Sequence, residues 1–100
     1  METNIKKSDG KLVVSFSGRF DTPSAVKHEK DLIQLTSNID RDIILDCSDM
    51  RYIASAGLRI FLAILKNAKS HGFHVYVRNL SDDVEKVFKT TGFIHIFEFC

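Results

Sequence analysis

A run of three branched apolar residues between two acids, Asp42 to Asp46, constrains the fold of this 100-residue chain more than any other feature. The consecutive side chains of Ile43, Ile44 and Leu45 show no polar alternation, which is typical of a β-strand buried on both faces. Such a strand needs a parallel neighbour or helices packed above it. The run therefore favours a sheet within an α/β fold.

Strand and helix signals alternate along the rest of the chain. Strand candidates at 4–7 and 11–17 surround the turn pair Asp9-Gly10 and predict a hairpin. The first predicted helix is capped by Thr22, has Pro23 at its first position and ends near residue 35. A strand at 42–46, a helix from Ser55 to about residue 70 and a strand at 73–77 follow. The last two predicted elements are a helix capped by Ser81 and ended by Gly92, and a strand at 93–99. The order β-β-α-β-α-β-α-β predicts a mixed, largely parallel sheet in one domain spanning 1–100, with an opening hairpin. We expect the three helices on one face.

Apolar stripes indicate which helix faces are buried. In the first helix, Ala25, Val26, Leu32 and Ile33 form the expected stripe. In the helix from Ser55, the expected core stripe is Leu58, Phe61, Leu62 and Leu65, with Ile60 and Ile64 on its flank. These two isoleucines fit either ordinary core packing or an exposed apolar surface.

Composition excludes several classes of function. The net charge of +1 provides no long-range attraction for nucleic acid or anionic lipid, so we expect neither a nucleic-acid nor a membrane partner. No leader-like or membrane-spanning apolar run is present. The two cysteines, Cys47 and Cys100, form no disulfide framework, and a cytoplasmic location is expected.

Signals for catalysis are few, and we expect a protein that is not an enzyme and uses no cofactor or metal. His71 and His74 are separated by a helix end and have no evident third ligand. Cys47 follows the buried strand and has no nearby histidine to activate it. Asp46 and Asp49 are expected in the loop after this strand, where local backbone hydrogen bonds are the favoured interpretation.

The segment from Tyr52 to Arg59 carries the most information. A serine at a helix start is commonly an N-cap, and Ser55 fits that role. The small residues Ala54, Ala56 and Gly57 also leave its hydroxyl uncrowded at a junction expected on the surface. From the residues alone, Ser55 fits a cap or an exposed functional hydroxyl.

Beyond these patterns, the chain resembles the STAS domain, and within it the bacterial anti-sigma factor antagonists. The resemblance rests on 42–46, on Tyr52-Ile53-Ala54-Ser55-Ala56-Gly57-Leu58-Arg59, on Gly72 with 75–77, and on 79–81, 84–88 and 92–93. The stretch from Phe16 to Asp21 is similar to the Gly-x-x-Asp turn of that family. One departure is Ala54, where many antagonists have Asp before the serine; the next position, often Ser or Thr, is Ala56.

The resemblance implies a phospho-regulated switch. Ser55 matches the serine that is phosphorylated in this family by the partner, an anti-sigma factor that is also a GHKL-type serine kinase. The unmodified form is expected to bind this partner and free a sigma factor. A PP2C-type phosphatase is expected to reset the switch. The residues then expected at the partner surface are Asp21, Ala54, Ser55, Ala56, Gly57, Arg59, Ile60 and Ile64.

Two other functions are compatible with the sequence. A STAS module can serve a different client, such as a lipid-transport ATPase subunit or a signalling scaffold, and Ala54 in place of Asp favours this slightly. A small nucleotide-binding enzyme would use Asp21, Asp46 and Ser55, although no triad or metal geometry is visible.

Overall fold

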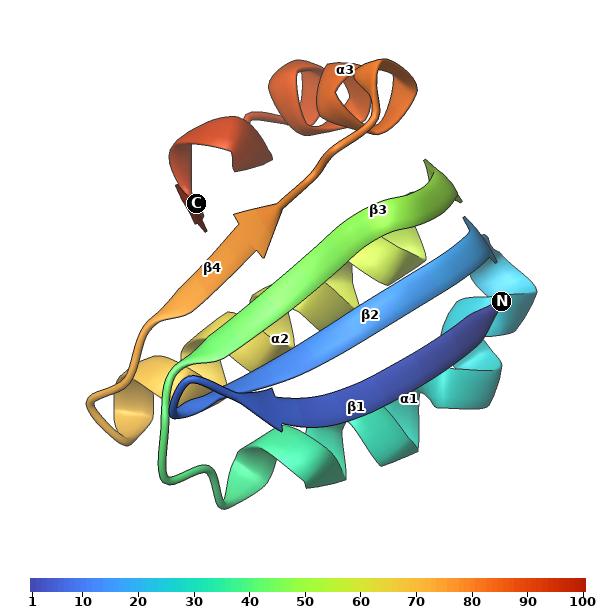
Figure 1. Ribbon diagram of the computed structural model, residues 1–100. Coiled ribbons are helices and arrows are strands. Elements are labelled where there is room, and N and C mark those ends of the chain that lie inside the picture. Colours follow the sequence, from blue (N-terminus) through green and yellow to red (C-terminus); the bar gives the residue numbers. More distant parts are fainter.

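The computed structural model describes all 100 residues and contains a mixed five-stranded sheet with three α-helices (Figure 1). The elements are β1 (Glu2–Ser8), β2 (Lys11–Phe20), α1 (Thr22–Ser37), β3 (Ile43–Ile53), α2 (Ser55–Ser70), β4 (Val75–Arg78), α3 (Asp82–Thr91), the 3₁₀ turn η1 (Phe93–His95) and β5 (Glu98–Phe99). The sheet order is β1-β2-β3-β4-β5; β1 and β2 are antiparallel and the other neighbours are parallel. The predicted element order and mixed sheet are confirmed.

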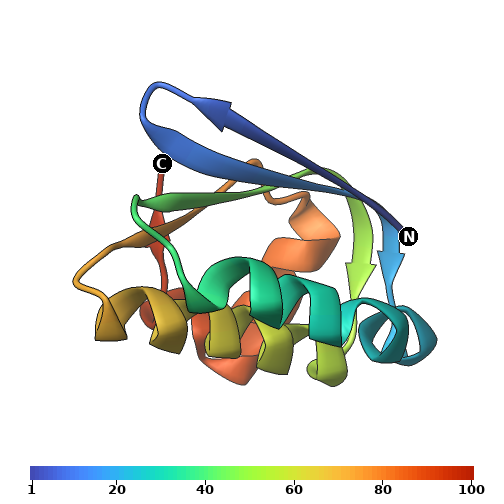
Figure 2. The same cartoon turned by 90° about the horizontal axis from the view of Figure 1, so that it is seen from below.

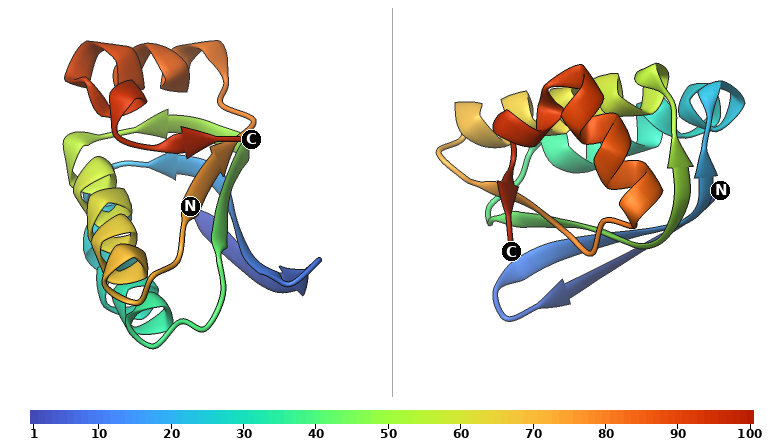
Figure 3. Two further views of the ribbon diagram at one scale, coloured as in Figure 1. Left: turned by 90° about the vertical axis from the view of Figure 1, so that its left-hand side faces the viewer. Right: turned by 90° about the horizontal axis from the view of Figure 1, so that it is seen from above.

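All three helices cover the same face of the sheet, as predicted (Figures 2 and 3). The core between the two layers contains a cluster of phenylalanine rings among aliphatic side chains. The ring of Phe61 on α2 lies 5.2 Å from Phe16 on β2 and 6.2 Å from Phe88 on α3, measured between centroids. The Phe61 side chain of α2 thus packs against both the sheet and α3, and α3 itself also lies on β3. None of the helices is both long and apolar enough to cross a membrane.

The opening hairpin forms where the turn pair predicts it. Asp9 and Gly10 have φ angles of 52° and 75°, the positive values that a two-residue type I′ turn requires. Val14 and Phe16 are buried in the core, and Ser15 and Ser17 lie on the opposite side. Both strands of the hairpin are longer than predicted.

Strand β3 corrects the predicted loop after residue 46. It continues to Ile53, so Asp46 and Asp49 lie within the strand. Its pairing with β2 shifts register between Ser15 and Ser17 and again near Gly18, which breaks the alternation of side chains that sequence reasoning relies on. Ile44 is buried on the helix-free face, where its register neighbours are Val13 and Tyr76.

The start of α1 differs from the prediction by one residue. Asp21, and not Thr22, is the N-cap: its Oδ1 accepts a hydrogen bond of 3.0 Å from the backbone N–H of Ser24. Pro23 is tolerated in the first turn, where its missing N–H has no intrahelical partner. Val26 was expected in the core stripe but is 76% exposed, because the buried side of α1 is set by Ala25, Leu32 and Thr36.

The last third of the chain confirms one element and corrects another. Ser81 caps α3 by accepting a hydrogen bond of 3.3 Å from the N–H of Val84, and Gly92 ends the helix with a φ of 81°. The predicted strand at 93–99 is mostly a 3₁₀ turn, and only Glu98–Phe99 pairs with β4.

Candidate functional site

Helices α1 and α2 begin at the same end of the sheet. Phe20 and Ile53, the last residues of β2 and β3, are register partners, and each helix starts two residues later. The N–H of Ala54 donates a hydrogen bond of 2.9 Å to the carbonyl of Phe20, which ties the two junctions together. Figure 2 shows the two helix starts side by side. Two distant segments thereby form one surface that contains Asp21 and Ser55.

Ser55 is the first residue of α2 and is exposed. The N-cap is Ala54, and no side chain caps the helix. The Ser55 hydroxyl makes no hydrogen bond, so the interpretation of this serine as an N-cap is wrong. The first-turn N–H groups of α2 have no intrahelical acceptors and no side-chain cap, which leaves a positive helix end beside the hydroxyl.

Gly57 lies beneath this surface rather than on it. It is buried, and a Cβ atom at this position would lie 3.0 Å from Cγ1 of Ile53 and 3.0 Å from the Phe20 ring. The absence of a side chain lets α2 approach the strand ends closely. The expectation that Gly57 contacts a partner is thus corrected: its role here is close packing that positions the neighbouring serine.

The flank of α2 is also buried. Ile60 and Ile64 are 1% and 0% exposed and belong to the main core, so the expected apolar docking patch is wrong. The physical reason is that α2 packs against α1 as well as against the sheet, which requires an apolar face wider than a single stripe. Arg59 remains exposed, and Ala54 and Ala56 are half-buried.

A cation–aromatic pair at this end was not foreseen from the sequence. The Cζ atom of Arg19 lies 4.3 Å from the ring centroid of Tyr52, and the two residues are register partners on β2 and β3. Tyr52 is 37% exposed, so the pair presents a preordered aromatic surface at this end of the sheet. Only the strand register reveals this contact, because the two residues are far apart in sequence.

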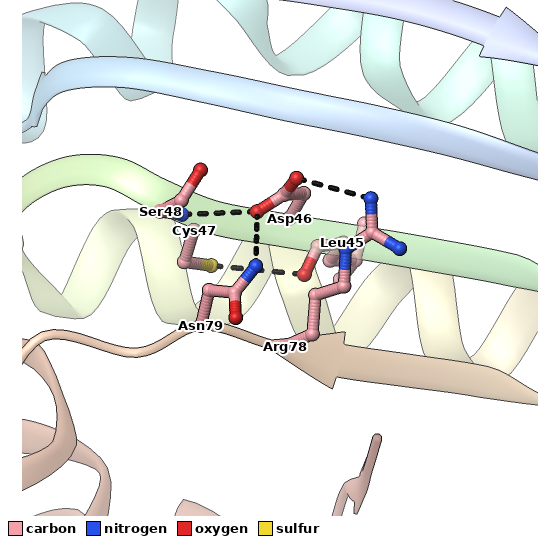
Figure 4. A network of polar contacts seen from close by, with 6 residues as sticks. All are labelled: Leu45, Asp46, Cys47, Ser48, Arg78 and Asn79. Carbon is pink, nitrogen blue, oxygen red and sulfur yellow. Dashed lines mark hydrogen bonds and ion pairs between the residues drawn. The ribbon is translucent and has the colours of Figure 1, made fainter.

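Asp46 belongs to a separate polar network (Figure 4). Its Oδ1 accepts hydrogen bonds from the N–H of Ser48 (3.0 Å) and from Asn79 (3.4 Å), and its Oδ2 lies 3.2 Å from the Arg78 guanidinium. Burial alone would raise the pKa of this carboxyl, but the hydrogen bonds from Ser48, Arg78 and Asn79 outweigh it and lower the pKa. The predicted local backbone bond is present, and the network also joins β3 to β4.

The residues proposed for an enzyme do not converge. Asp46 precedes the end of β3 by seven residues, about 23 Å along a strand, whereas Asp21 and Ser55 lie beyond that end. Burial raises the pKa of the Cys47 thiol to about 12, and the charge of Asp46 adds to the shift. His71 and His74 have different partners, the carbonyl of Asn67 and the carboxylate of Glu98.

Comparisons with known proteins agree with this architecture. The family model described as the STAS domain matches residues 2–100. BtrV of Bordetella bronchiseptica, named as an anti-sigma factor antagonist, is 30% identical over 97 residues, which cover 97% of this chain and 84% of BtrV. The anti-sigma-B factor antagonist of Bacillus subtilis is 26% identical, with coverage of 98% and 89%.

A solved structure of another anti-sigma factor antagonist is also similar to this chain. The crystal structure of an anti-sigma factor antagonist from Mycobacterium paratuberculosis superposes with a TM-score of 0.81 at 26% identity, covering 98% of this chain and 83% of that one. The sheet order, the shared start of α1 and α2 and the family match over nearly every residue lead to one assignment: this chain belongs to the STAS domain family.

Proposed function

We propose that this chain is an anti-sigma factor antagonist controlled by phosphorylation of Ser55. In its unmodified form it binds an anti-sigma factor that is also a GHKL-type serine kinase, and a sigma factor is released. Phosphorylation ends the binding, and a PP2C-type phosphatase restores it. The observation that carries the proposal is the exposed hydroxyl of Ser55, free of hydrogen bonds at an uncapped helix start.

The relatives support the first part of this proposal. BtrV and the Bacillus subtilis protein are both named anti-sigma factor antagonists, and this chain aligns with 84% and 89% of their lengths. The aligned region therefore includes most of each antagonist.

The electrostatics of the α2 start favour a phosphate on Ser55. The modification adds about −1.5 to −2 charge and three acceptor oxygens. The first turn of α2 contains no acidic residue, and its free N–H groups and dipole attract an anion. The first turn of α3 is the opposite case, since it contains Asp82, Asp83 and Glu85, and its serine is already occupied as a cap. Phosphorylated Ser55 is thus compatible with an intact fold.

The proposed docking surface surrounds this serine. It comprises the exposed or half-buried residues Asp21, Tyr52, Ala54, Ser55, Ala56 and Arg59, with the buried Gly57 supporting it from below. A charged phosphate inside this surface would have to be desolvated or would face like charge, at a cost of several kcal/mol. Each 1.4 kcal/mol weakens binding tenfold, so one phosphate is sufficient to end the association.

The first test is the intact mass of the protein after expression in its native host, with and without phosphatase treatment. The proposal requires a mass increase of one phosphate that maps to Ser55 and disappears after treatment. Protein that carries no phosphate under every growth and stress condition tried, in cells that contain the partner, would contradict phosphoregulation.

The second test identifies the client. Ala54, which offers no carboxylate beside Ser55, is the observation that favours a different client, such as a lipid-transport ATPase or a signalling scaffold. Capture from native lysate with the unmodified chain should retain a GHKL-type kinase, and a Ser55→Glu bait should lose it at least tenfold. Retention of a transporter ATPase by both baits would support the alternative.

A further inference from the structure

Arg59 lies one helical turn after Ser55. Both residues are exposed, and residues four apart on an α-helix are surface neighbours with Cβ atoms about 5–6 Å apart. An anionic residue that precedes a cationic one by four positions is the favourable orientation, because it also suits the helix dipole. A phosphate on Ser55 would therefore lie within reach of the Arg59 guanidinium.

The guanidinium of Arg59 is free to take such a partner. It has no ion pair or hydrogen bond, whereas two other arginines, Arg41 and Arg78, each hold an aspartate. The same spacing already forms a pair elsewhere in this protein: Glu85 and Lys89 on α3 approach to 3.9 Å with the acid on the N-terminal side. The fold thus accommodates this geometry on an exposed helix face.

We propose that Arg59 forms an intrahelical ion pair with the phosphate of modified Ser55 and is thereby withdrawn from the docking surface. In the unmodified protein the guanidinium is free to bind a carboxylate of the partner. Phosphorylation then has two effects, since it adds a negative group and it also neutralises the cation one helical turn away. The regulatory meaning of this pair rests on the proposed function, but its formation does not.

The pair is tested by phosphorus NMR on the full chain with phosphoserine installed at position 55 during translation. The second pKa of a phosphoserine is about 6, and a paired cation lowers it by favouring the dianion. We expect Arg59→Gln to raise this pKa by about 0.3 unit relative to the parent, the effect of one i,i+4 pair. Arg59→Lys should restore part of the difference. Lys66→Gln, which removes an exposed cation about two turns beyond Arg59 on α2, is the matched control and should have no effect.

A second signal comes from the arginine itself. The Nε–H resonance of Arg59 should shift when phosphoserine replaces serine, while that of Arg51, an exposed arginine on β3, stays in place. Equal pKa values in the parent and in Arg59→Gln, or equal rises in the Arg59 and Lys66 variants, would overturn the pair. Because the phosphate is installed during synthesis, this result is independent of whether a kinase modifies Ser55 in the cell.

Discussion

Gly57 on α2 packs against the ring of Phe20 on β2 so closely that a Cβ atom on the glycine would lie 3.0 Å from the ring Cγ. Phe20 and the second neighbour, Ile53, are 0% and 1% exposed, so neither side chain has free space into which to move. The close packing that positions Ser55 therefore depends on the missing side chain of Gly57, two residues further along the first turn of α2.

Replacement of this glycine by alanine should destabilise the protein. Alanine favours a helix by up to about 1 kcal/mol, but overpacking of a full core costs about 1–3 kcal/mol. We expect Gly57→Ala to lower the free energy of unfolding by about 1 kcal/mol, measured by urea denaturation. Ala56→Ser, at the adjacent half-buried position, is the control and should change stability less. An unchanged or higher midpoint for Gly57→Ala would show that the helix start has room to move.

The two serines at helix starts should respond differently to alanine. Ser81 caps α3 through the N–H of Val84, and loss of an N-cap costs about 1 kcal/mol. Ser55 makes no such bond, so Ser55→Ala should stay within about 0.5 kcal/mol of the parent. Urea denaturation of both variants measures the contrast. Equal losses would mean that the Ser55 hydroxyl does cap its helix in solution.

The Asp46 network should make stability depend on pH. Because the pKa of this carboxyl is lower in the folded state than its ordinary value of 3.8, its contribution is complete above that value and disappears as the pH falls through the folded pKa. We expect Asp46→Asn to lower the free energy of unfolding by about 1–3 kcal/mol near neutral pH, since it removes the charge that pairs with the Arg78 guanidinium. The difference in unfolding free energy between Asp46→Asn and the parent should shrink at pH values below 3.8.

The control for this experiment is the neighbouring exposed acid, Asp49, whose carboxylate has no hydrogen bond or ion pair. Asp49→Asn should change stability little at either pH. Urea denaturation near neutral pH and in acid measures the unfolding free energies of the parent and both variants. A constant difference between Asp46→Asn and the parent at both pH values would contradict the linkage.

The two thiols should differ in reactivity. Cys47 is buried and its pKa is raised to about 12, whereas Cys100 is exposed. Because the thiolate is the reactive form, Ellman's reagent at mildly alkaline pH should modify one thiol per native chain and two in denaturant. Cys100→Ser should leave no rapidly reacting thiol. Rapid modification of that variant in its native state would show that the centre of the sheet opens easily.

Much of this protein follows from local sequence. The Asp9-Gly10 pair determines the hairpin, Ser81 and Gly92 delimit α3, and the apolar run at Ile43 identifies a central strand, because each acts through its own backbone preference or burial. The serine segment that marks the candidate site is also continuous in sequence. These features were predictable since no distant residue is needed to produce them.

Tertiary structure decided which of these side chains are available. Ile60 and Ile64 became core because α2 packs against α1 as well as against the sheet, and Gly57 became a packing contact because Phe20 and Ile53 lie against it. Arg19 and Tyr52 became a pair only through the register of two parallel strands. Local pattern specifies where a helix or strand begins, but exposure and cross-strand contact depend on which elements pack together, and that information lies in segments far apart along the chain.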